Sequence, residues 1–458
     1  MIRNTKRRLE VFTFYNHTGL TRHFEKMARK GWLIHRISSL GWVYRRIEPK
    51  DIHFAISYYP KASEFDPEPS EGQKTFHEFC AHTGWMLACT TAQMQVFYNE
   101  QEDPVPIETD PALEVETIHA AIKKSFLPAQ ITLLVMGLLF GWIAALRLVG
   151  NPIAFLADPM SVFTVCCWSM VFWLSLLEIT MYFRWHKRAE EAAENGQFLD
   201  TPDTSKVHWT AMGILGVGVL YLVLNIVGSS DQLLQFIMAG MTVYMVLLFI
   251  LAEGIKRLGK RLKLSRNVNR TVTFVLVFIL SWAMSMTVTF SAMELREQGI
   301  LDRGEKVTLT EVPLHMEDLI EVEGTYITPL SDSESIFLKQ INITQMPHFD
   351  EPHHSVGPNM EYTIIYVKMP FLYETCKRQM VKDLTQANRL NIPVEYRDRL
   401  EPTDPTLWGA EKAYYVVNDG VDWESNHYFL CYPDRFVEIK FSWEATKEQM
   451  QIAGGKLG

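Results

Sequence analysis

Hydrophobic residues are distributed unevenly along this chain of 458 residues. Between residues 126 and 293 they gather in five stretches of 19 to 24 residues without Asp, Glu, Lys or Arg, whereas the flanking segments mix polar and apolar residues. About 20 helical residues cross the apolar core of a bilayer, which is roughly 30 Å thick. The stretches are Phe126–Leu146, Pro159–Leu177, Val207–Ser230, Gln232–Ala252 and Thr271–Met293. They predict transmembrane helices over residues 126–146, 159–183, 207–229, 232–252 and 271–293.

Basic residues beside these stretches indicate an orientation. Lys123 and Lys124 precede the first stretch, and seven basic residues lie between the fourth and the fifth, whereas loop 151–158 and turn 228–232 contain none. Because basic loops stay on the cytoplasmic side, we predict a multi-pass protein of the cell membrane with a cytoplasmic amino terminus and an extracytoplasmic carboxyl terminus. The first 120 residues show no apolar stretch behind a basic start, so we expect no signal peptide there.

The segments outside the membrane region predict two folded domains. Strand-like alternation at residues 335–344 and 361–368, an apolar helix stripe at 372–384 and a hairpin pattern at 427–443 are typical of an α+β domain with an antiparallel sheet. The expected fold is a membrane protein in which a bundle of five transmembrane helices lies between a cytoplasmic and an extracytoplasmic α+β domain. The predicted regions are a cytoplasmic domain at 1–98, an acidic linker and membrane approach at 99–124, a transmembrane region at 125–293 and an extracytoplasmic domain at 294–458.

The cytoplasmic domain contains an internal repeat. Residues 23–44 and 76–97 align without a gap at an offset of 53. In each copy an apolar helix stripe stops at a glycine, Gly31 or Gly84, and a tryptophan, Trp32 or Trp85, begins an alternating strand. With further strand-like runs at residues 11–15, 42–47, 53–59 and 94–98, this pattern predicts two helix-plus-hairpin units with two-fold pseudosymmetry.

The two glycine–tryptophan pairs, with the Trp42-Val43-Tyr44 strand and the strand from His53 to Pro60, resemble the bacterial family known as domain of unknown function 2812. The resemblance covers about the first quarter of the chain. It implies that hydrophobic helices follow the domain, and it suggests genomic association with PadR-type transcriptional repressors. It carries no catalytic residues, and the carboxyl-terminal domain lies outside it.

The net charge of -9 conceals a strong segregation of charge within the cytoplasmic domain. Residues 1–50 have a balance of +9, and residues 51–120 have a balance of -11. We expect the basic start to contact the anionic inner leaflet, with a protein partner or a solvated surface as alternatives. Nucleic acid is disfavoured as a partner because the basic residues lack a recognition helix or stacking aromatic residues.

Polar and small residues inside the predicted spans suggest specific contacts. Glu178 and Asn225 are the intramembrane polar candidates. For Glu178 we favour snorkelling or pairing with Arg184, six residues further along, over a proton or ion site. Gly137, Gly141 and Ala145 recur every four residues, which favours helix packing within the bundle over homodimerisation.

Candidate chemistry in the external domain is limited to two groups of residues. His348, Asp350, His353 and His354 lie on one segment, where a transition metal could bind, although a polar loop is favoured because helical His-Glu-x-x-His spacing is absent. Cys376 and Cys431 are the external cysteines, and buried thiols are favoured over a disulfide.

The architecture predicts a signalling or regulatory protein that couples the external domain to the cytoplasmic one. The alternatives are an accessory protein for transport or membrane homeostasis, resting on Glu178 and Asn225, and an external metal-dependent hydrolase, resting on the histidine segment. We expect no enzymatic activity and no cofactor. The expected partners are the lipid bilayer and a cytoplasmic or membrane protein; a homo-oligomer stays open.

Overall fold

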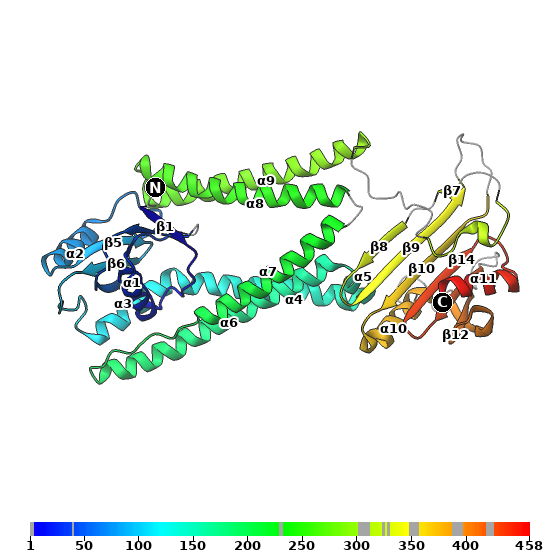
Figure 1. The fold of residues 1–458 in the computed structure, drawn as a ribbon, viewed down its shortest axis with the longest axis horizontal. Helices are drawn as coiled ribbons and strands as arrows, with labels where there is room; N and C mark the ends of the chain where they lie inside the picture. The colour runs from blue at the N-terminus through cyan, green and yellow to red at the C-terminus, as the bar shows by residue number, and fades with distance from the viewer. Residues whose placement is uncertain are drawn as a thin grey trace. The chain divides into compact units, whose positions relative to one another are not determined.

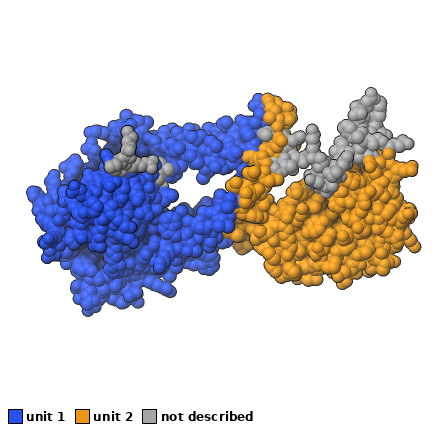
Figure 2. Space-filling model, viewed as in Figure 1, with its two compact units in different colours: residues 1–138, 168–220, 236–295 blue, residues 139–167, 221–235, 296–458 orange. Residues whose placement is uncertain are grey.

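The computed structural model describes residues 4–38, 41–228, 232–300, 312–322, 326–327, 330–347, 357–386, 397–417 and 426–458 (Figure 1). The chain divides into two compact units, coloured separately in Figure 2. One unit comprises residues 1–138, 168–220 and 236–295, and the other comprises residues 139–167, 221–235 and 296–458. Each unit therefore combines a folded terminal domain with parts of the long helices.

Two antiparallel sheets, with strand orders β1-β3-β2 and β4-β6-β5, form the amino-terminal domain together with three helices. Its elements are β1 (Thr5–Arg8), α1 (His17–Ala28), β2 (Trp32–Arg36), β3 (Trp42–Arg46), β4 (His53–Tyr58), α2 (Glu71–His82), β5 (Met86–Thr91), β6 (Met94–Asn99) and α3 (Pro111–Lys124). The strand predicted at residues 11–15 is wrong. That segment ends in a turn, in which the Asn16 amide donates to the Thr13 carbonyl at 3.0 Å, and β1 takes the sheet edge instead.

The glycine–tryptophan pairs mark the ends of α1 and α2. Gly31 has a φ of +79° and Gly84 a φ of +88°, a left-handed conformation that glycine adopts without steric cost. A Cβ atom at Gly31 would also lie 2.9 Å from the Ile47 carbonyl oxygen. The hairpins that follow, β2–β3 and β5–β6, each contain one shift of register.

Five helices among the described residues are long and apolar enough to cross a membrane. They are α4 (Phe126–Gly150), α6 (Pro159–Glu194), α7 (Ser205–Gly228), α8 (Gln232–Arg261) and α9 (Arg266–Glu297). Only 6 to 11% of the most apolar window of each helix is buried within the protein, so its apolar side chains face outward. This exposure is what a lipid environment requires, because exposed apolar patches of this size are rare on soluble monomers.

The carboxyl-terminal domain is built on an eight-stranded antiparallel sheet. The order is β11-β12-β13-β14-β10-β9-β7, and β8 pairs with β9. The strands are β7 (Tyr326–Ile327), β8 (Leu330–Glu334), β9 (Leu338–Pro347), β10 (Met360–Val367), β11 (Arg399–Thr403), β12 (Lys412–Val417), β13 (Asn426–Cys431) and β14 (Arg435–Phe441), and the helices are α10 (Tyr373–Leu384) and α11 (Lys447–Leu457). The predicted hairpin at 427–443 corresponds to β13 and β14, and the predicted helix stripe corresponds to α10.

A short helix between two apolar helices belongs to the core of this second unit. In α5 (Pro152–Ala157), Ile153 and Ala157 are buried in the cluster that also holds Cys376 and Phe436. The Ser333 hydroxyl donates to the Ala157 carbonyl at 3.1 Å, and the Ser335 hydroxyl donates to the Leu156 carbonyl. The connection between α4 and α6 is thus fixed to the carboxyl-terminal sheet by apolar packing and hydrogen bonds.

Candidate coupling junction

A buried polar cluster joins the segment before α1 to the ends of α6 and α7. The Thr13 hydroxyl donates to Glu178 Oε1 at 3.3 Å, and the Thr13 and Thr204 hydroxyls are hydrogen-bonded to each other. Thr13, Glu178 and Thr204 are 6%, 2% and 1% exposed. A carboxyl group from a predicted membrane helix therefore lies in contact with the amino-terminal domain. We call Thr13, Glu178, Thr204 and His208, with the aromatic residues described below, the junction.

His208 completes this cluster through both of its ring nitrogens. Its Nδ1 lies 3.0 Å from the Thr204 carbonyl oxygen, and because a carbonyl only accepts, Nδ1 carries a hydrogen. Its Nε2 lies 3.5 Å from Glu178 Oε1. This distance is longer than that of an ordinary hydrogen bond, so His208 Nε2 is close to the carboxyl group of Glu178 without a direct hydrogen bond to it. Glu178 Oε2 is buried and has no hydrogen-bond partner among the described residues.

Aromatic packing extends the junction along α6. Tyr15 is fully buried and contacts Tyr182, Trp185 and Phe126 with ring centroids 5.4, 5.9 and 5.5 Å away. Burial, with the charge of Glu178 as a second cause, raises the pKa of Tyr15 well above its usual range. Tyr182 and Trp185 belong to the same hydrophobic cluster as the amino-terminal domain. The domain and α6 therefore share one core.

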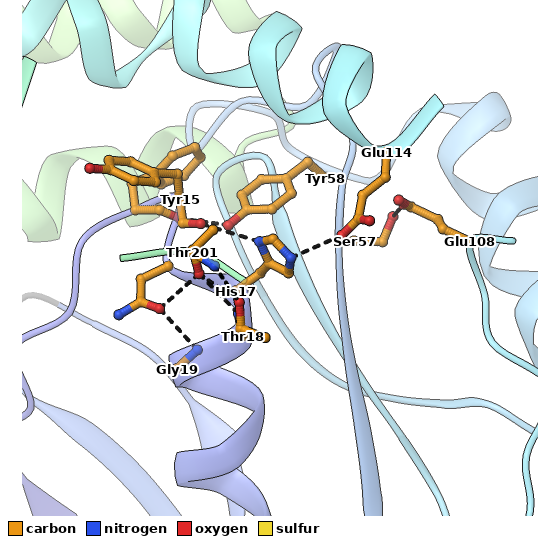
Figure 3. A network of polar contacts seen from close by, with 11 residues as sticks. Tyr15, His17, Thr18, Gly19, Ser57, Tyr58, Glu108, Glu114 and Thr201 are labelled. Carbon is orange, nitrogen blue, oxygen red and sulfur yellow. Dashed lines mark hydrogen bonds and ion pairs between the residues drawn. The ribbon is translucent and has the colours of Figure 1, made fainter. Parts of the chain in front are cut away.

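Polar contacts around the start of α1 surround this core (Figure 3). Asn16 Oδ1 caps α1 by accepting from the Gly19 amide at 2.9 Å, and it also accepts from the Thr201 hydroxyl at 3.0 Å. The Thr201 amide donates to the Thr18 hydroxyl oxygen at 2.9 Å. The cap of α1 and the loop between α6 and α7 consequently share the same side chains, so a shift of one would disturb the other.

A cleft beside the junction is lined by His17, Ser57, Glu108 and Glu114 (Figure 3). His17 Nε2 lies 2.9 Å from Glu114, and the Ser57 hydroxyl donates to Glu108 at 2.7 Å. Burial raises the pKa of Glu108, opposed by the Ser57 hydrogen bond and aided by the charge of Glu114. These contacts pair the polar groups with one another, and the described part of the chain contains no group of three His, Cys, Asp or Glu residues arranged to hold a metal ion.

A second contact region joins the amino-terminal domain to α8 and α9 through charges. Glu64 lies 2.9 Å from Lys256, and Glu68 lies 2.9 Å from Lys263. Arg266 makes a two-point contact with Asp66 at 2.6 and 2.8 Å. We call these three ion pairs the charged clasp. They show that part of the acidic half of the domain is matched by the basic connection between α8 and α9.

Asn269 anchors the charged clasp. It is 1% exposed, and its Nδ2 donates to the Phe65 carbonyl at 3.0 Å. The rings of Phe65 and Phe274 lie 6.2 Å apart. The acidic loop between β4 and α2 is therefore held by one buried amide and one aromatic contact in addition to the exposed charges.

The intramembrane residues selected from the sequence differ in their burial and contacts. Glu178 is buried against Thr13 and His208, and no contact with Arg184 is present. Asn225 is exposed on α7 and does not meet Glu178. A Cβ atom at Gly137 would lie 2.8 Å from Phe172 Cβ, which shows a close approach of α4 and α6, whereas one at Gly141 would meet nothing within 4 Å. Ala145 is exposed.

The domain-signature tryptophans take different environments. Trp32 is half-buried between Lys6 Nζ and the Arg46 guanidinium, which lie 5.4 and 5.9 Å from its ring. Trp85 is 4% exposed, and its Nε1 donates to the Val105 carbonyl at 2.8 Å. Trp32 therefore contacts basic side chains of its sheet. Trp85, in contrast, connects the second helix-plus-hairpin unit to the segment that precedes α3 through a hydrogen bond.

Two groups of candidate residues belong to the carboxyl-terminal part of the chain. His348, Asp350, His353 and His354 lie outside the described residues. Cys376 and Cys431 are free thiols buried in one apolar cluster, and burial raises the pKa of each to about 11. A thiol with a raised pKa is mostly protonated at neutral pH and is a poor nucleophile.

Sequence patterns did not reveal Thr13, Thr204, His208 or Asn269 as contact residues. Thr204 and His208 lie four residues apart where an apolar stretch begins, a spacing that places them on one helix face. That spacing is compatible with an ordinary helix start, so it gave no reason to select them. Thr13, which contacts Thr204 and Glu178, lies 165 residues before Glu178, a separation that no local pattern encodes.

Comparison with known proteins identifies only the amino-terminal region. Residues 21–129 match the family model described as Protein of unknown function (DUF2812). No curated protein and no solved structure matches the chain. The matched range runs from α1 through α3 into the first residues of α4, and the junction residue Thr13 lies before it. Residues 21–129 are thus similar to the DUF2812 family of proteins of unknown function, and five apolar helices accompany this region in the same chain.

Proposed function

We propose that this chain is a membrane signalling or regulatory protein in which the carboxyl-terminal domain acts on the amino-terminal domain through α6. The observation that carries the proposal is the shared core of the amino-terminal domain and α6, made by Tyr15, Tyr182 and Trp185. A domain tethered only by a flexible linker would not share a core with a membrane helix. A change in α6 is therefore expected to reach the domain directly.

The other end of α6 supports the same proposal. α6 is one unbroken helix of 36 residues, about 54 Å long at 1.5 Å per residue. It begins directly after α5, which Ser333 and Ser335 bind through its carbonyl groups. A helix is stiff along its axis, so a displacement of α5 by the carboxyl-terminal sheet has a continuous path to the junction.

The contacts also support the proposed orientation. The amino-terminal domain contacts loop 195–204, which is flanked by the basic residues Arg184, Lys187, Arg188 and Lys206, and it contacts the basic α8–α9 connection. Basic residues around a connection favour the cytoplasmic side. The carboxyl-terminal domain contacts loop 151–158, which lacks basic residues and is assigned to the outside. We therefore propose a cytoplasmic amino terminus and an extracytoplasmic carboxyl terminus.

We also propose that the amino-terminal domain is an internal duplication of one helix-plus-hairpin unit. Both units end their helix at a glycine with positive φ, and both continue into a hairpin with one register shift. The proposed recipient of the signal is a cytoplasmic protein. The resemblance to the family suggests a PadR-type repressor, which co-purification of the full chain would test.

Transport remains a second proposal without comparable support. It rests on Glu178 and Asn225, and these residues make no contact with each other. The variant Glu178→Gln separates the proposals. An amide cannot carry a proton as a carboxyl group does, so the substitution would abolish proton transport. The contact between Glu178 and Thr13 that the coupling proposal uses would largely be kept. An external hydrolase rests on the histidine segment alone; a metal analysis of the purified full chain tests it.

Amide hydrogen exchange on the full chain in lipid nanodiscs tests the coupling. The double variant Ser333→Ala/Ser335→Ala removes both hydrogen bonds to α5, and we expect faster exchange at residues 13–20 and 199–208. Ser331→Ala is the matched control, because Ser331 lies exposed on the same strand and makes no such bond. Identical exchange at these residues in the wild type and the double variant, with α5 itself loosened, would refute the coupling.

A further inference from the structure

Two arginines in the polar part of α6 form no ion pair with Glu178, the partner that the sequence suggested for Arg184. Arg184 and Arg188 lie one helical turn apart, directly after the apolar part of α6. Neither forms an ion pair with a carboxylate of the described residues, because Glu178 is bound to Thr13 and His208 instead. Side chains at positions i and i+4 share a helix face, so the two guanidinium groups present donors to the same surface.

A small pocket is formed around these arginines. Arg184, Trp185 and Arg188 contribute one side, and Met181, Leu199 and Pro202 contribute apolar surface. Asp200 also lines the pocket, but it is paired with Arg22. The local charge of the three arginines and one carboxylate therefore remains positive.

Trp185 provides an independent sign of a missing acceptor. The residue is 5% exposed, and its Nε1 is buried without a hydrogen-bond partner among the described residues. An indole N–H only donates, and buried donors are nearly always paired in folded proteins. An anionic oxygen in the pocket would accept from this group, while the arginines would bind the same anion through paired N–H groups.

We propose that this pocket binds the phosphate of an anionic phospholipid headgroup. The membrane supplies the ligand because the pocket lies where the apolar part of α6 ends, and exposed Phe183 lies beside it on the same helix. Met181 and Leu199 provide apolar contact for the lipid below its phosphate. Since Trp185 also stacks on Tyr15, the bound headgroup would lie against the ring that joins α6 to the amino-terminal domain.

This inference is separate from the proposed coupling, although a lipid held there would stabilise the junction. Native mass spectrometry of the full chain, released from nanodiscs of phosphatidylglycerol and phosphatidylcholine, measures retained lipid. We expect retained phosphatidylglycerol in the wild type and a loss of about tenfold affinity per removed arginine, because each substitution removes charge-assisted hydrogen bonds to the phosphate. The test variants are Arg184→Gln and Arg188→Gln, singly and together.

Three further variants distinguish specific binding of the headgroup in the pocket from the general attraction of basic residues to anionic lipids. Lys187→Gln removes an exposed charge from the same helix outside the pocket and should retain the lipid. Arg184→Lys/Arg188→Lys keeps the charge but loses the paired N–H donors, and Trp185→Phe keeps the ring but loses the indole donor; both should weaken retention several-fold. Equal retention in the double Gln variant and in Lys187→Gln would overturn the site.

Inorganic phosphate distinguishes a lipid from a soluble anion. Isothermal titration of phosphate into the full chain in neutral detergent should show no binding, because the free anion lacks the apolar part. Binding of phosphate that disappears in Arg184→Gln/Arg188→Gln would overturn the assignment to lipid. The coupling proposal is tested by exchange in the Ser333→Ala/Ser335→Ala variant, so the two can fail independently.

Discussion

The amino-terminal domain is attached to the helices by two regions of opposite character. The junction is buried and combines aromatic rings with a carboxyl group, hydroxyl groups and an imidazole. The charged clasp is mostly exposed: Glu64 and Lys263 are 54% and 76% exposed in their side chains. Exposed ion pairs contribute about 0 to 1 kcal/mol each, whereas a buried aromatic side chain contributes several. The comparison indicates that the junction holds the domain and the charged clasp orients it.

Replacement of Tyr15 should have the largest effect. Tyr15→Ala removes a fully buried ring from the core shared with α6, and we expect a loss of about 3–5 kcal/mol in the free energy of unfolding. Tyr15→Phe is the matched control, because the Tyr15 hydroxyl has no hydrogen-bond partner among the described residues. Thermal unfolding of the solubilised full chain measures both. Equal destabilisation by the two variants would contradict the role assigned to the ring.

Replacement of Glu178 should have an intermediate effect that depends on the new side chain. Glu178→Ala leaves the buried Thr13 hydroxyl without its acceptor, so we expect a loss of about 1–3 kcal/mol. Glu178→Gln can keep an oxygen that accepts from the Thr13 hydroxyl, although that oxygen cannot also donate to His208 Nε2, because both contacts are made by Oε1. It should cost less than Glu178→Ala, about 1 kcal/mol or less. The same unfolding measurement applies. Similar losses for Ala and Gln would show that the carboxylate charge, and not the acceptor for Thr13, is required.

Acidification should weaken the domain before it releases the charged clasp. Burial, aided by the charge of Arg8, lowers the pKa of His23 from its ordinary 6.5 to about 4. The unfolded chain therefore binds a proton between pH 6.5 and 4 that the folded domain rejects, so stability is lost as the pH falls through this window. Proteolysis of the full chain at graded pH measures the effect. His23→Gln should flatten the profile, and an unchanged profile would rule out this cause.

Removal of a charge from the clasp should have the smallest effect. Asp66→Asn breaks the two-point contact with Arg266, and we expect a loss of about 1 kcal/mol or less at low salt. The loss should shrink in 1 M salt, where the Debye length is about 3 Å, whereas the effect of Tyr15→Ala should not change. Glu71→Gln is the control, since its exposed pair with Lys74 lies outside the clasp. If Asp66→Asn lost more unfolding free energy than Glu178→Ala, and the loss did not depend on salt, the charged clasp and not the junction would hold the domain.

Local sequence patterns predicted helices and strands well where a single residue, or a short hydrophobic repeat, determines the backbone conformation. Gly31 and Gly84 end their helices because a left-handed turn favours glycine, and α10 follows the apolar stripe from Leu372 to Leu384. The strand predicted at residues 11–15 was wrong for a tertiary reason. Its aromatic residues alternate as in a strand, but Tyr15 is buried against α6, outside the sheet.

Candidate sites were harder to predict because their partners are distant in sequence. Glu178 was selected as an intramembrane polar residue, and Arg184 was proposed as its partner because Arg184 lies nearby on the same helix. The structure replaces that local partner with Thr13 and His208. The histidine segment lies outside the described residues, so its metal-binding hypothesis stays a prediction.

The sequence by itself determined that five helices are apolar enough to cross a membrane and that charge is segregated along the chain, because both follow from composition over short windows. Only the tertiary structure decided how the charges pair and where Glu178 is satisfied. Hydrogen bonds and ion pairs act over a few ångströms in space, and those between Thr13 and Glu178 and between Asp66 and Arg266 join residues that are 165 and 200 positions apart. The acidic loop of the amino-terminal domain and the basic α8–α9 connection are complementary because the fold brings them together.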